Sequence, residues 1–240
     1  MISRIRVGTW NVHEGVTDHG DVLDEAVEHV LAERLDLLAL QEVPFPEGSR
    51  SSPLLTELAE RTRLRHYQAN VLSPSWLVQG KRSGVAVASR FPIETAAVAV
   101  LPNPRLERGG MLSFDKGTVT ARVRAMGRLV AMTSLHMPPF HRFGRRADDP
   151  DFGYIWDNLA KQLEPEEDEV TVIAGDFNTS HRRLLLRRIG ADLETSVTGA
   201  TRRGKAVDDI VHSASVARVS ARVVRTFSDH CLCVAELDLG

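Results

Sequence analysis

The sequence predicts an α/β protein in which strands and helices are interleaved within one domain. Apolar runs of strand length recur along the chain, and stretches with apolar residues at helical spacing lie between several of them. No internal repeat, low-complexity stretch or linker divides the 240 residues, a length that buries a core without disulfide or metal cross-links. We therefore expect a single domain that spans residues 1–240.

The N-terminal part begins with a strand, a helix and a second strand. Residues 4–12 alternate apolar and polar side chains, which is typical of a strand. Residues 18–35 carry apolar side chains on one helical stripe, and either Asp18 or Asp21 is placed to cap that helix. Residues 35–43 form a mostly apolar run, which favours a buried strand.

The middle of the chain contributes one helix and several strands. Pro53 marks the start of a helix, because proline is favoured at the first helical position. Residues 84–90 have a strand pattern, and residues 93–101 alternate more loosely. Residues 117–125 and 128–136 are two strand patterns joined by a short turn.

The C-terminal part continues the alternation of strands and helices. Residues 152–163 predict a helix, 170–176 a buried strand, and 181–190 a short basic helix. Three strand patterns follow, at 207–213, 219–227 and 231–237. The least regular stretches, where substrate contacts are commonest, are 43–53, 102–110, 137–150 and 196–206.

Composition limits the partners and the compartment. The formal net charge is −2, so any grip on phosphate must come from local basic clusters or from a bound cation. Cys231 and Cys233 are two apart in a strand pattern and cannot easily bridge each other. We expect reduced thiols, no signal peptide, no transmembrane segment and a cytoplasmic monomer.

Polar side chains recur where apolar strands end or begin. Each alone has an ordinary structural explanation, as Asn178 could cap the helix at 181–190. Glu42 is harder to explain in this way, because it follows a mostly apolar run and a buried carboxylate needs partners. Ligand sites of α/β folds gather at strand ends. The residues placed there are Asn11, Glu42, His136, Asp176, Asn178, Asp208, Asp229 and His230.

Seven short motifs around these positions resemble the endonuclease/exonuclease/phosphatase superfamily and occur in its order. They are TWNV (9–12), LLALQEV (37–43), SGVAVASRFPI (83–93), TSLHMP (133–138), AGDFNTS (174–180), VDDIVHS (207–213) and SDHC (228–231). The resemblance implies a four-layer sandwich of two mixed, mainly antiparallel β-sheets packed face to face, with helices on the outside. It also implies a metal-dependent phosphoric ester hydrolase.

One position departs from the family's pattern. Asp209 stands where the family usually has an aromatic residue or a histidine. Asp208 is the better match to the family's aspartate, because Val207 and Ile210 flank the pair as the pattern requires. The extra carboxylate leaves open which of the two acids faces the site.

The resemblance implies a cation held by oxygen ligands. Glu42 would be its main ligand, with Asn11 and Asp229 assisting. Oxygen donors without sulfur favour Mg²⁺ or Mn²⁺ over Zn²⁺. The alternative zinc site would use Cys231, Cys233 and His230. That set lacks the fourth ligand of a structural zinc centre.

The resemblance also implies the catalytic residues. His230 paired with Asp208 resembles the family's His–Asp dyad, in which the carboxylate fixes the imidazole tautomer and the pair activates water or stabilises the transition state. Asp176 and Asn178 would orient the nucleophile and a phosphate oxygen. His136 would protonate the leaving oxygen or bind the phosphate.

The substrate is less constrained by the sequence. Basic residues cluster in three loops, at 81–82, 142–146 and 202–205, and the alternative to a phosphate-binding rim is a solvated arginine-rich surface. The candidate substrate-binding residues are Arg145, Arg146, Arg202 and Arg203. Four aromatic residues could line a pocket or belong to the core: Trp76, Phe140, Phe143 and Phe152.

Three functions are compatible with these residues. Hydrolysis of a phosphodiester, in nucleic acid or in another ester, ranks first. An enzyme is favoured over an inactive module because every matched acid, amide and histidine is present. Hydrolysis of a sugar, inositol or lipid phosphomonoester ranks second. An inactive binding module on the same scaffold ranks third, and a purely structural metal protein would require the motif residues to be scattered in space.

Overall fold

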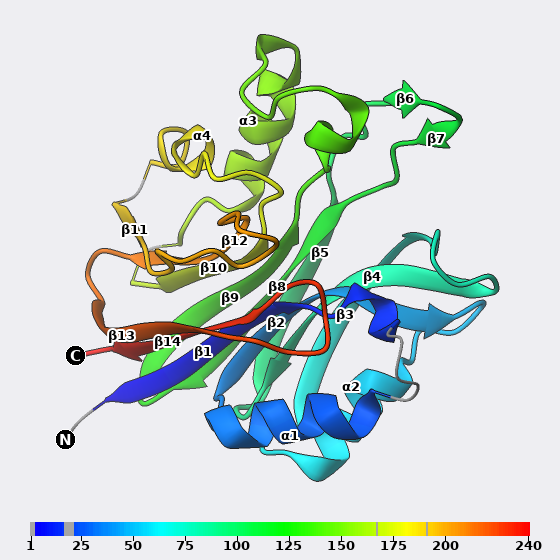
Figure 1. The fold of residues 1–240 in the computed structure, drawn as a ribbon. Helices are drawn as coiled ribbons and strands as arrows, with labels where there is room; N and C mark the ends of the chain where they lie inside the picture. Colours follow the sequence, from blue (N-terminus) through cyan, green and yellow to red (C-terminus); the bar gives the residue numbers. More distant parts are fainter. Residues whose placement is uncertain (1–2, 17–21, 167, 191) are drawn as a thin grey trace.

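The computed structural model describes residues 3–16, 22–166, 168–190 and 192–240. Asp18 and Asp21, the predicted helix caps, lie outside the described residues. Two six-stranded β-sheets pack face to face, and helices lie on their outer sides (Figure 1). This arrangement confirms the predicted four-layer sandwich.

The first sheet places the N-terminal and C-terminal strands side by side. Its β1 and β2 run parallel, and its other neighbouring strands are antiparallel. In spatial order the strands are β13 (Ala217–Val224), β14 (Leu232–Asp238), β1 (Arg4–Asn11), β2 (Leu37–Pro46), β4 (Lys81–Ser89) and β3 (His66–Pro74).

The second sheet also contains one parallel pair, β9 with β10, among antiparallel neighbours. In spatial order its strands are β11 (Leu193–Thr195), β12 (Asp208–Ser213), β10 (Val170–Asp176), β9 (Arg128–His136), β8 (Gly117–Ala125) and β5 (Ile93–Val100). Each sheet is therefore mixed and mainly antiparallel, as predicted.

The helices form the two outer layers. Helices α1 (Leu23–Glu33) and α2 (Pro53–Arg61) pack on the first sheet, whereas α3 (Gly153–Gln162) and α4 (Arg183–Leu186) pack on the second. None of the helices in the described ranges has the length and apolar character to cross a membrane. The remaining elements are a hairpin of β6 (Glu107–Arg108) with β7 (Met111–Leu112), and the 3₁₀ turns η1 (His13–Gly15), η2 (Phe140–Phe143) and η3 (Pro150–Phe152).

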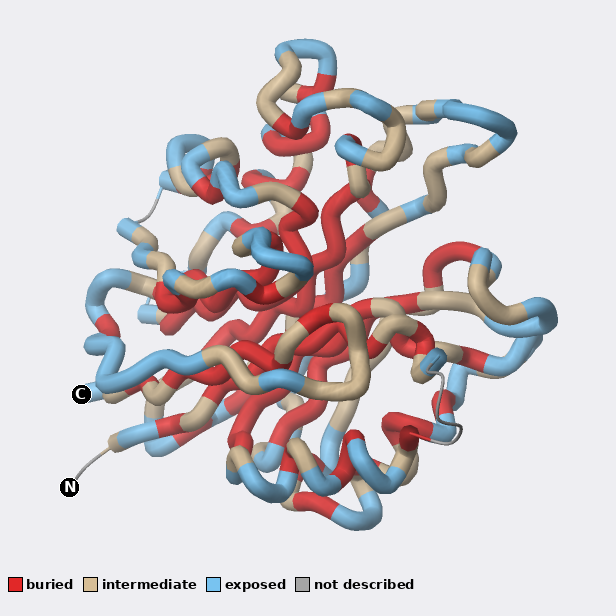
Figure 2. The backbone as a smooth tube through the Cα atoms, viewed as in Figure 1, coloured by how far each residue is buried: buried red, intermediate tan, exposed pale blue. Residues whose placement is uncertain are grey.

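Side-chain alternation along the strands produces three apolar layers. In β2, Leu37 and Ala39 belong to the core between the sheets, whereas Leu38 and Leu40 pack beneath α1 and α2. A strand buried on both faces therefore appears in the sequence as a continuous apolar run. Figure 2 shows the buried backbone concentrated along the strands, with exposed segments on the outer helices and loops.

Three expectations about local structure were wrong. Strand β3 was not predicted, because this edge strand is only partly buried and lacks apolar alternation. Residues 43–46 were expected in a loop but extend β2, where hydrogen bonds to β4 override the two prolines. The helix predicted at 181–190 contracts to α4, which is flanked by turns.

Candidate active site

The ends of three adjacent strands carry three of the predicted site residues. In the register of the second sheet, Asp176 on β10 lies opposite His136 on β9 and opposite Asp208 on β12. Gly175 permits this approach, because a Cβ atom there would lie 2.0 Å from the carbonyl oxygen of Leu135. The polar strand ends therefore meet at one edge of the sheet.

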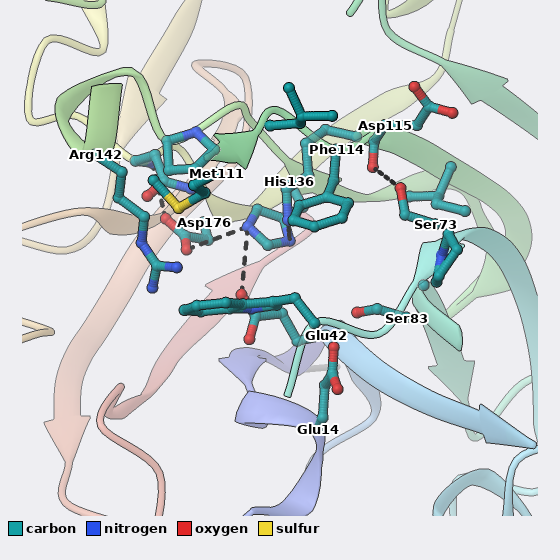
Figure 3. A pocket seen from close by; sticks show the side chains of 18 of the residues that line it. Glu14, Glu42, Ser73, Ser83, Met111, Phe114, Asp115, His136, Arg142 and Asp176 are labelled. Carbon is teal, nitrogen blue, oxygen red and sulfur yellow. Dashed lines mark hydrogen bonds and ion pairs between the residues drawn. The ribbon is translucent and has the colours of Figure 1, made fainter. Parts of the chain in front are cut away.

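The first sheet places Asn11 and Glu42 against this row. Asn11 Nδ2 donates to Asp176 Oδ2 at 3.2 Å, which joins the two sheets. Glu42 occupies a β-bulge in β2, where its φ is +52° and it has no register partner on β4. A bulge can re-aim a side chain. Here the carboxylate faces His136, with Glu42 Oε1 3.8 Å from His136 Nε2 (Figure 3).

Asp208, rather than Asp209, contacts the predicted partner histidine. His230 Nδ1 lies 2.9 and 3.0 Å from the two carboxylate oxygens of Asp208. Asp209 accepts a hydrogen bond of 3.0 Å from Arg182 Nε instead. Successive side chains of a strand point to opposite faces of the sheet. Asp208 therefore faces the interior between the sheets, and Asp209 faces the α3–α4 side.

Replacing Asp209 by alanine is expected to destabilise the fold. The side chains of Arg182 and Asp209 are 8% and 3% exposed, so the variant would leave a buried guanidinium without its counter-charge. The free energy of unfolding should fall by about 3–5 kcal/mol, which urea denaturation would measure. The double variant Arg182→Met with Asp209→Leu should recover most of the loss. Unchanged stability of Asp209→Ala would contradict this structural role.

The segment after β10 holds Asp176 and Asn178 together. The Asn178 backbone N–H donates to Asp176 Oδ1 at 2.8 Å, and Asn178 Nδ2 donates to the carbonyl oxygen of Met137 at 2.8 Å. Asn178 has a φ of +51°, a conformation that asparagine adopts more readily than most residues. Its side chain does not cap α4, which begins at Arg183 without a side-chain cap.

Burial and neighbouring carboxylates shift two pKa values in the dyad region. Burial opposes the charged form of His230, but the attraction of Asp176 and Asp208 raises its pKa to about 9. Burial raises the pKa of Asp176 to about 6, and the repulsion of Asp208 adds to this while the charge of His230 opposes it. His230 is therefore cationic at neutral pH, and it lies with Nε2 3.7 Å from Asp176 Oδ2.

His136 differs from His230 in its charge and its proton position. Burial lowers the pKa of His136 well below its usual value, and the positive charge of Lys116 adds to the effect. Burial lowers the pKa of Lys116, whereas the charges of Glu42 and Asp176 favour its ammonium form. Its Nζ lies 3.2 Å from His136 Nδ1, and an ammonium group can only donate. The neutral ring therefore carries its proton on Nε2, which lies 3.6 Å from Asp176 Oδ2.

Two carboxylate oxygens at the site have no hydrogen-bond partner among the described residues, namely Glu42 Oε2 and Asp229 Oδ1. They lie 3.4 and 3.6 Å from His13 Nδ1. Burial would raise the pKa of Glu42, but the nearby imidazole of His13 and the charge of Lys116 hold it well below its usual range. Ionised oxygens without donors fit a hard divalent cation.

The other possible cation ligands already make hydrogen bonds within the protein. Asn11 Oδ1 already accepts the backbone N–H of His13 at 3.0 Å. Ligand atoms of Asp176, Asp208 and His230 lie within 4.8 Å of one another and could also hold a metal ion. Both oxygens of Asp208, however, face His230 Nδ1. Glu42 and Asp229 therefore offer the freer oxygens.

The structure separates the predicted arginines. Arg202 donates to Asp229 Oδ2 at 2.6 and 2.9 Å and lines the pocket beside His230. Arg203 is mostly exposed, lies 3.7 Å from the same carboxylate, and borders a neighbouring hollow. Arg145 and Arg146 line neither the pocket nor this hollow. They pair locally with Asp148, Asp149 and Asp151.

Sequence reasoning missed several residues of the site. His13 lies beside Glu42 and Asp229, and Glu14 lines the pocket; both follow the TWNV motif, which is a usable signal. Lys116 also lines the pocket and has no motif around it. Arg142 also lines the pocket; its guanidinium carbon lies 4.6 Å from the centre of the Trp76 ring, and it forms no ion pair among the described residues.

The aromatic candidates divide between pocket and core. Trp76 and Phe143 line the pocket. Phe140 and Phe152 are buried and stack on each other, with ring centres 4.5 Å apart.

Both cysteines are free thiols. Cys233 lies in the core between the sheets, and Cys231 is half-buried. The grouping of possible metal ligands in the described part of the chain contains His230 but neither cysteine. The geometry therefore gives no support to the alternative zinc site.

The fold and these strand-end residues define the class of protein. The sequence pattern of the Endonuclease/Exonuclease/phosphatase family matches residues 8–230, and the chain belongs to this family. Members of the family are mostly phosphoesterases. Comparison with curated proteins gives no significant match.

Solved structures share the fold at low sequence identity. The endonuclease/exonuclease/phosphatase from Beutenbergia cavernae is 20% identical, with a TM-score of 0.79 over 99% of this chain and 72% of that chain. The human Nocturnin catalytic domain with bound sulfate anion is 20% identical, with a TM-score of 0.69 over 98% and 93%. A mannosyl-6-phosphatase from Bacteroides thetaiotaomicron is 15% identical, with a TM-score of 0.66 over 97% and 99%.

Proposed function

We propose that this protein is a divalent-metal-dependent phosphoesterase that hydrolyses phosphodiester bonds. The observation that carries the proposal is that side chains from both sheets line one pocket, among them Glu42, His136, Asp176 and His230. The pocket combines ionised oxygens, a cationic imidazole and a neutral imidazole. Hydrolysis of a phosphate ester requires charge neutralisation, an activated water and a stabilised leaving oxygen.

The dyad and Asp176 form the part of the site that handles the attacking water. Asp208 holds the proton on His230 Nδ1 and leaves Nε2 directed towards Asp176. Asp176, whose pKa lies at about 6, can accept a hydrogen bond from water or take its proton. Asn178 holds Asp176 in place through its backbone N–H.

His136 and the carboxylates serve the phosphoryl group. Neutral His136 can donate a hydrogen bond from its Nε2–H to a non-bridging or leaving oxygen of the ester. Glu42 and Asp229 would hold Mg²⁺ or Mn²⁺ through the oxygens that lack donors, with Asn11 beside them. A cation bound there would offset phosphate charge and polarise a phosphoryl oxygen.

The balance of charge favours a diester over a monoester. A diester carries one negative charge, whereas a monoester carries close to two at neutral pH. Arg202 is neutralised by Asp229, so Arg142 is the one pocket guanidinium without a carboxylate partner in the described part of the chain. Lys116 and His230 also line the pocket, but Glu42, Asp176 and Asp208 offset their charges. Arg142 and a bound cation therefore remain for the ester, which matches the smaller charge.

Metal removal tests the proposal. Wild-type protein treated with EDTA should lose at least ~10-fold of its turnover of bis-p-nitrophenyl phosphate, and Mg²⁺ or Mn²⁺ should restore it. p-Nitrophenyl phosphate should be cleaved more slowly under the same conditions. Full activity after stripping would remove the metal from the proposal. A preference for the monoester would favour the phosphomonoesterase alternative, and no cleavage of either ester would favour the binding module.

A further inference from the structure

The pocket beside the catalytic residues has one apolar wall. Its lining includes Trp76, Met111, Leu112, Phe114, Pro139 and Phe143. Trp76 is 48% exposed and Leu112 is 59% exposed, whereas Trp10 and Trp156 are each 1% exposed. Exposed apolar side chains gathered around a pocket commonly mark a binding surface. Neither Trp76 nor Leu112 belongs to the hydrophobic core clusters of the described residues.

Two hairpins from different sheets supply most of this wall. Trp76 lies in the loop between β3 and β4 of the first sheet, and Leu112 lies in the β6–β7 hairpin between β5 and β8 of the second. Figure 1 shows both hairpins projecting on the same side of the molecule. In Figure 3, Met111 and Phe114 lie beside His136 and Asp176, so the wall adjoins the proposed phosphoryl position.

Trp76 is held in place by its neighbours. Ser75 Oγ accepts the backbone N–H groups of Leu77 and Val78 at 3.1 and 2.7 Å, and it donates to Glu14 Oε2. Glu14 is itself 3% exposed. The Arg142 guanidinium stacks over the indole ring, as described above. The loop and the ring are therefore ordered before any ligand arrives, which reduces the entropy cost of binding.

The polar rim of the wall limits what can bind there. Glu14, Ser73, Ser83 and Asp115 also line the pocket. Lys116 lies in the same lining, but the two carboxylates outnumber it and repel further phosphates of a nucleic-acid backbone. They would also be costly to bury beneath lipid tails. Hydroxyl and carboxylate oxygens accept hydrogen bonds from a polar ring, and an indole stacks on any flat π-system.

We infer that Trp76 and the apolar wall bind a planar ring carried by the phosphate ester, either a nucleobase or an aryl group. The inference rests on the proposed function, since it places the phosphoryl group beside His136 and Asp176. Arg142 then lies between the ring and the phosphate and can contact both. This wall selects small esters with a flat substituent over sugar phosphates.

Fluorescence can test this inference without turnover. Trp10 and Trp156 are buried, so a ligand that stacks in the pocket should quench the emission of Trp76. Full-length wild-type protein should show saturable quenching with adenosine 5′-monophosphate or phenyl phosphate, and little with ribose 5-phosphate. The tighter binder of the first two identifies the ring as nucleobase or aryl. Equal quenching by ribose 5-phosphate would overturn the inference.

Variants extend the test. By calorimetry, Trp76→Ala should weaken adenosine 5′-monophosphate binding by roughly 5- to 100-fold, whereas Trp76→Phe should keep most of it. Tyr154→Ala, which removes a similarly exposed aromatic residue on α3, should leave binding unchanged. Undiminished binding by Trp76→Ala would refute the assignment.

Two further outcomes separate this inference from its alternatives. A blue shift of Trp76 emission with sphingomyelin vesicles, without quenching by adenosine 5′-monophosphate, would overturn it in favour of a lipid surface. Ring-dependent quenching in a protein that cleaves no ester would support the binding wall and contradict the proposed function alone.

Discussion

Replacing His230 by alanine is expected to lower turnover of a phosphodiester by roughly 10²–10⁴-fold. The imidazole is the one group that contacts Asp208 through Nδ1 and faces Asp176 through Nε2. Its loss removes a positive charge from a buried pair of carboxylates. Steady-state kinetics with bis-p-nitrophenyl phosphate and Mg²⁺ would measure the effect, and circular dichroism would establish that the variant stays folded.

His181→Ala provides the matched control for this measurement. His181 is half-exposed, contacts Asp148 at 3.5 Å, and does not line the pocket. The His181→Ala variant should keep turnover within about twofold of wild type, because surface substitutions away from the core and the active site have small effects on stability. Near-normal turnover by a folded His230→Ala protein would exclude His230 from the chemistry.

Replacing Asp176 by asparagine should have an effect of similar size, roughly 10²–10⁴-fold on turnover. The substitution keeps the shape of the side chain and the acceptor for the Asn178 backbone N–H, but it removes the negative charge and the ability to take a proton. Asp176 is also the residue on which Asn11, His136 and His230 converge. The same diester assay measures the loss.

Asp157→Asn is the control for this second variant. Asp157 lies on α3, pairs with Arg188, and is largely exposed. The control should behave as wild type in turnover and in thermal unfolding. If Asp176→Asn lost activity only in proportion to a loss of folded protein, its role would be structural and the catalytic assignment would be wrong.

Local patterns predicted most strands because burial leaves a direct trace in sequence. The apolar runs of β2 and β10 are buried on both faces and were identified. Strand β3 was missed because its side chains are only partly buried, so its conformation comes from pairing with β4. The two prolines near the end of β2 predicted a loop, because the sequence of this segment does not show that β4 pairs with it.

The candidate site residues that stand in motifs were predicted, whereas those that loops bring to the pocket were missed. Asp176 and His230 stand in recognisable motifs, and the structure brings them within 3.7 Å. Arg145 and Arg142 lie three residues apart in one basic loop, yet the first pairs with Asp149 and the second reaches the pocket. Composition cannot distinguish these two arginines, because a local ion pair and a cleft contact require the same residue type.

The sequence by itself determined the strand-end residues, because burial produces apolar runs and polar motif residues follow them. Through the resemblance of these motifs it also determined the family and the two-sheet fold. Only the tertiary structure decided that Asp208 rather than Asp209 contacts His230. It also decided that Trp76 lines the pocket. The physical reason is that side-chain direction depends on the pairing of strands and on the packing of loops, and both join residues far apart in the sequence.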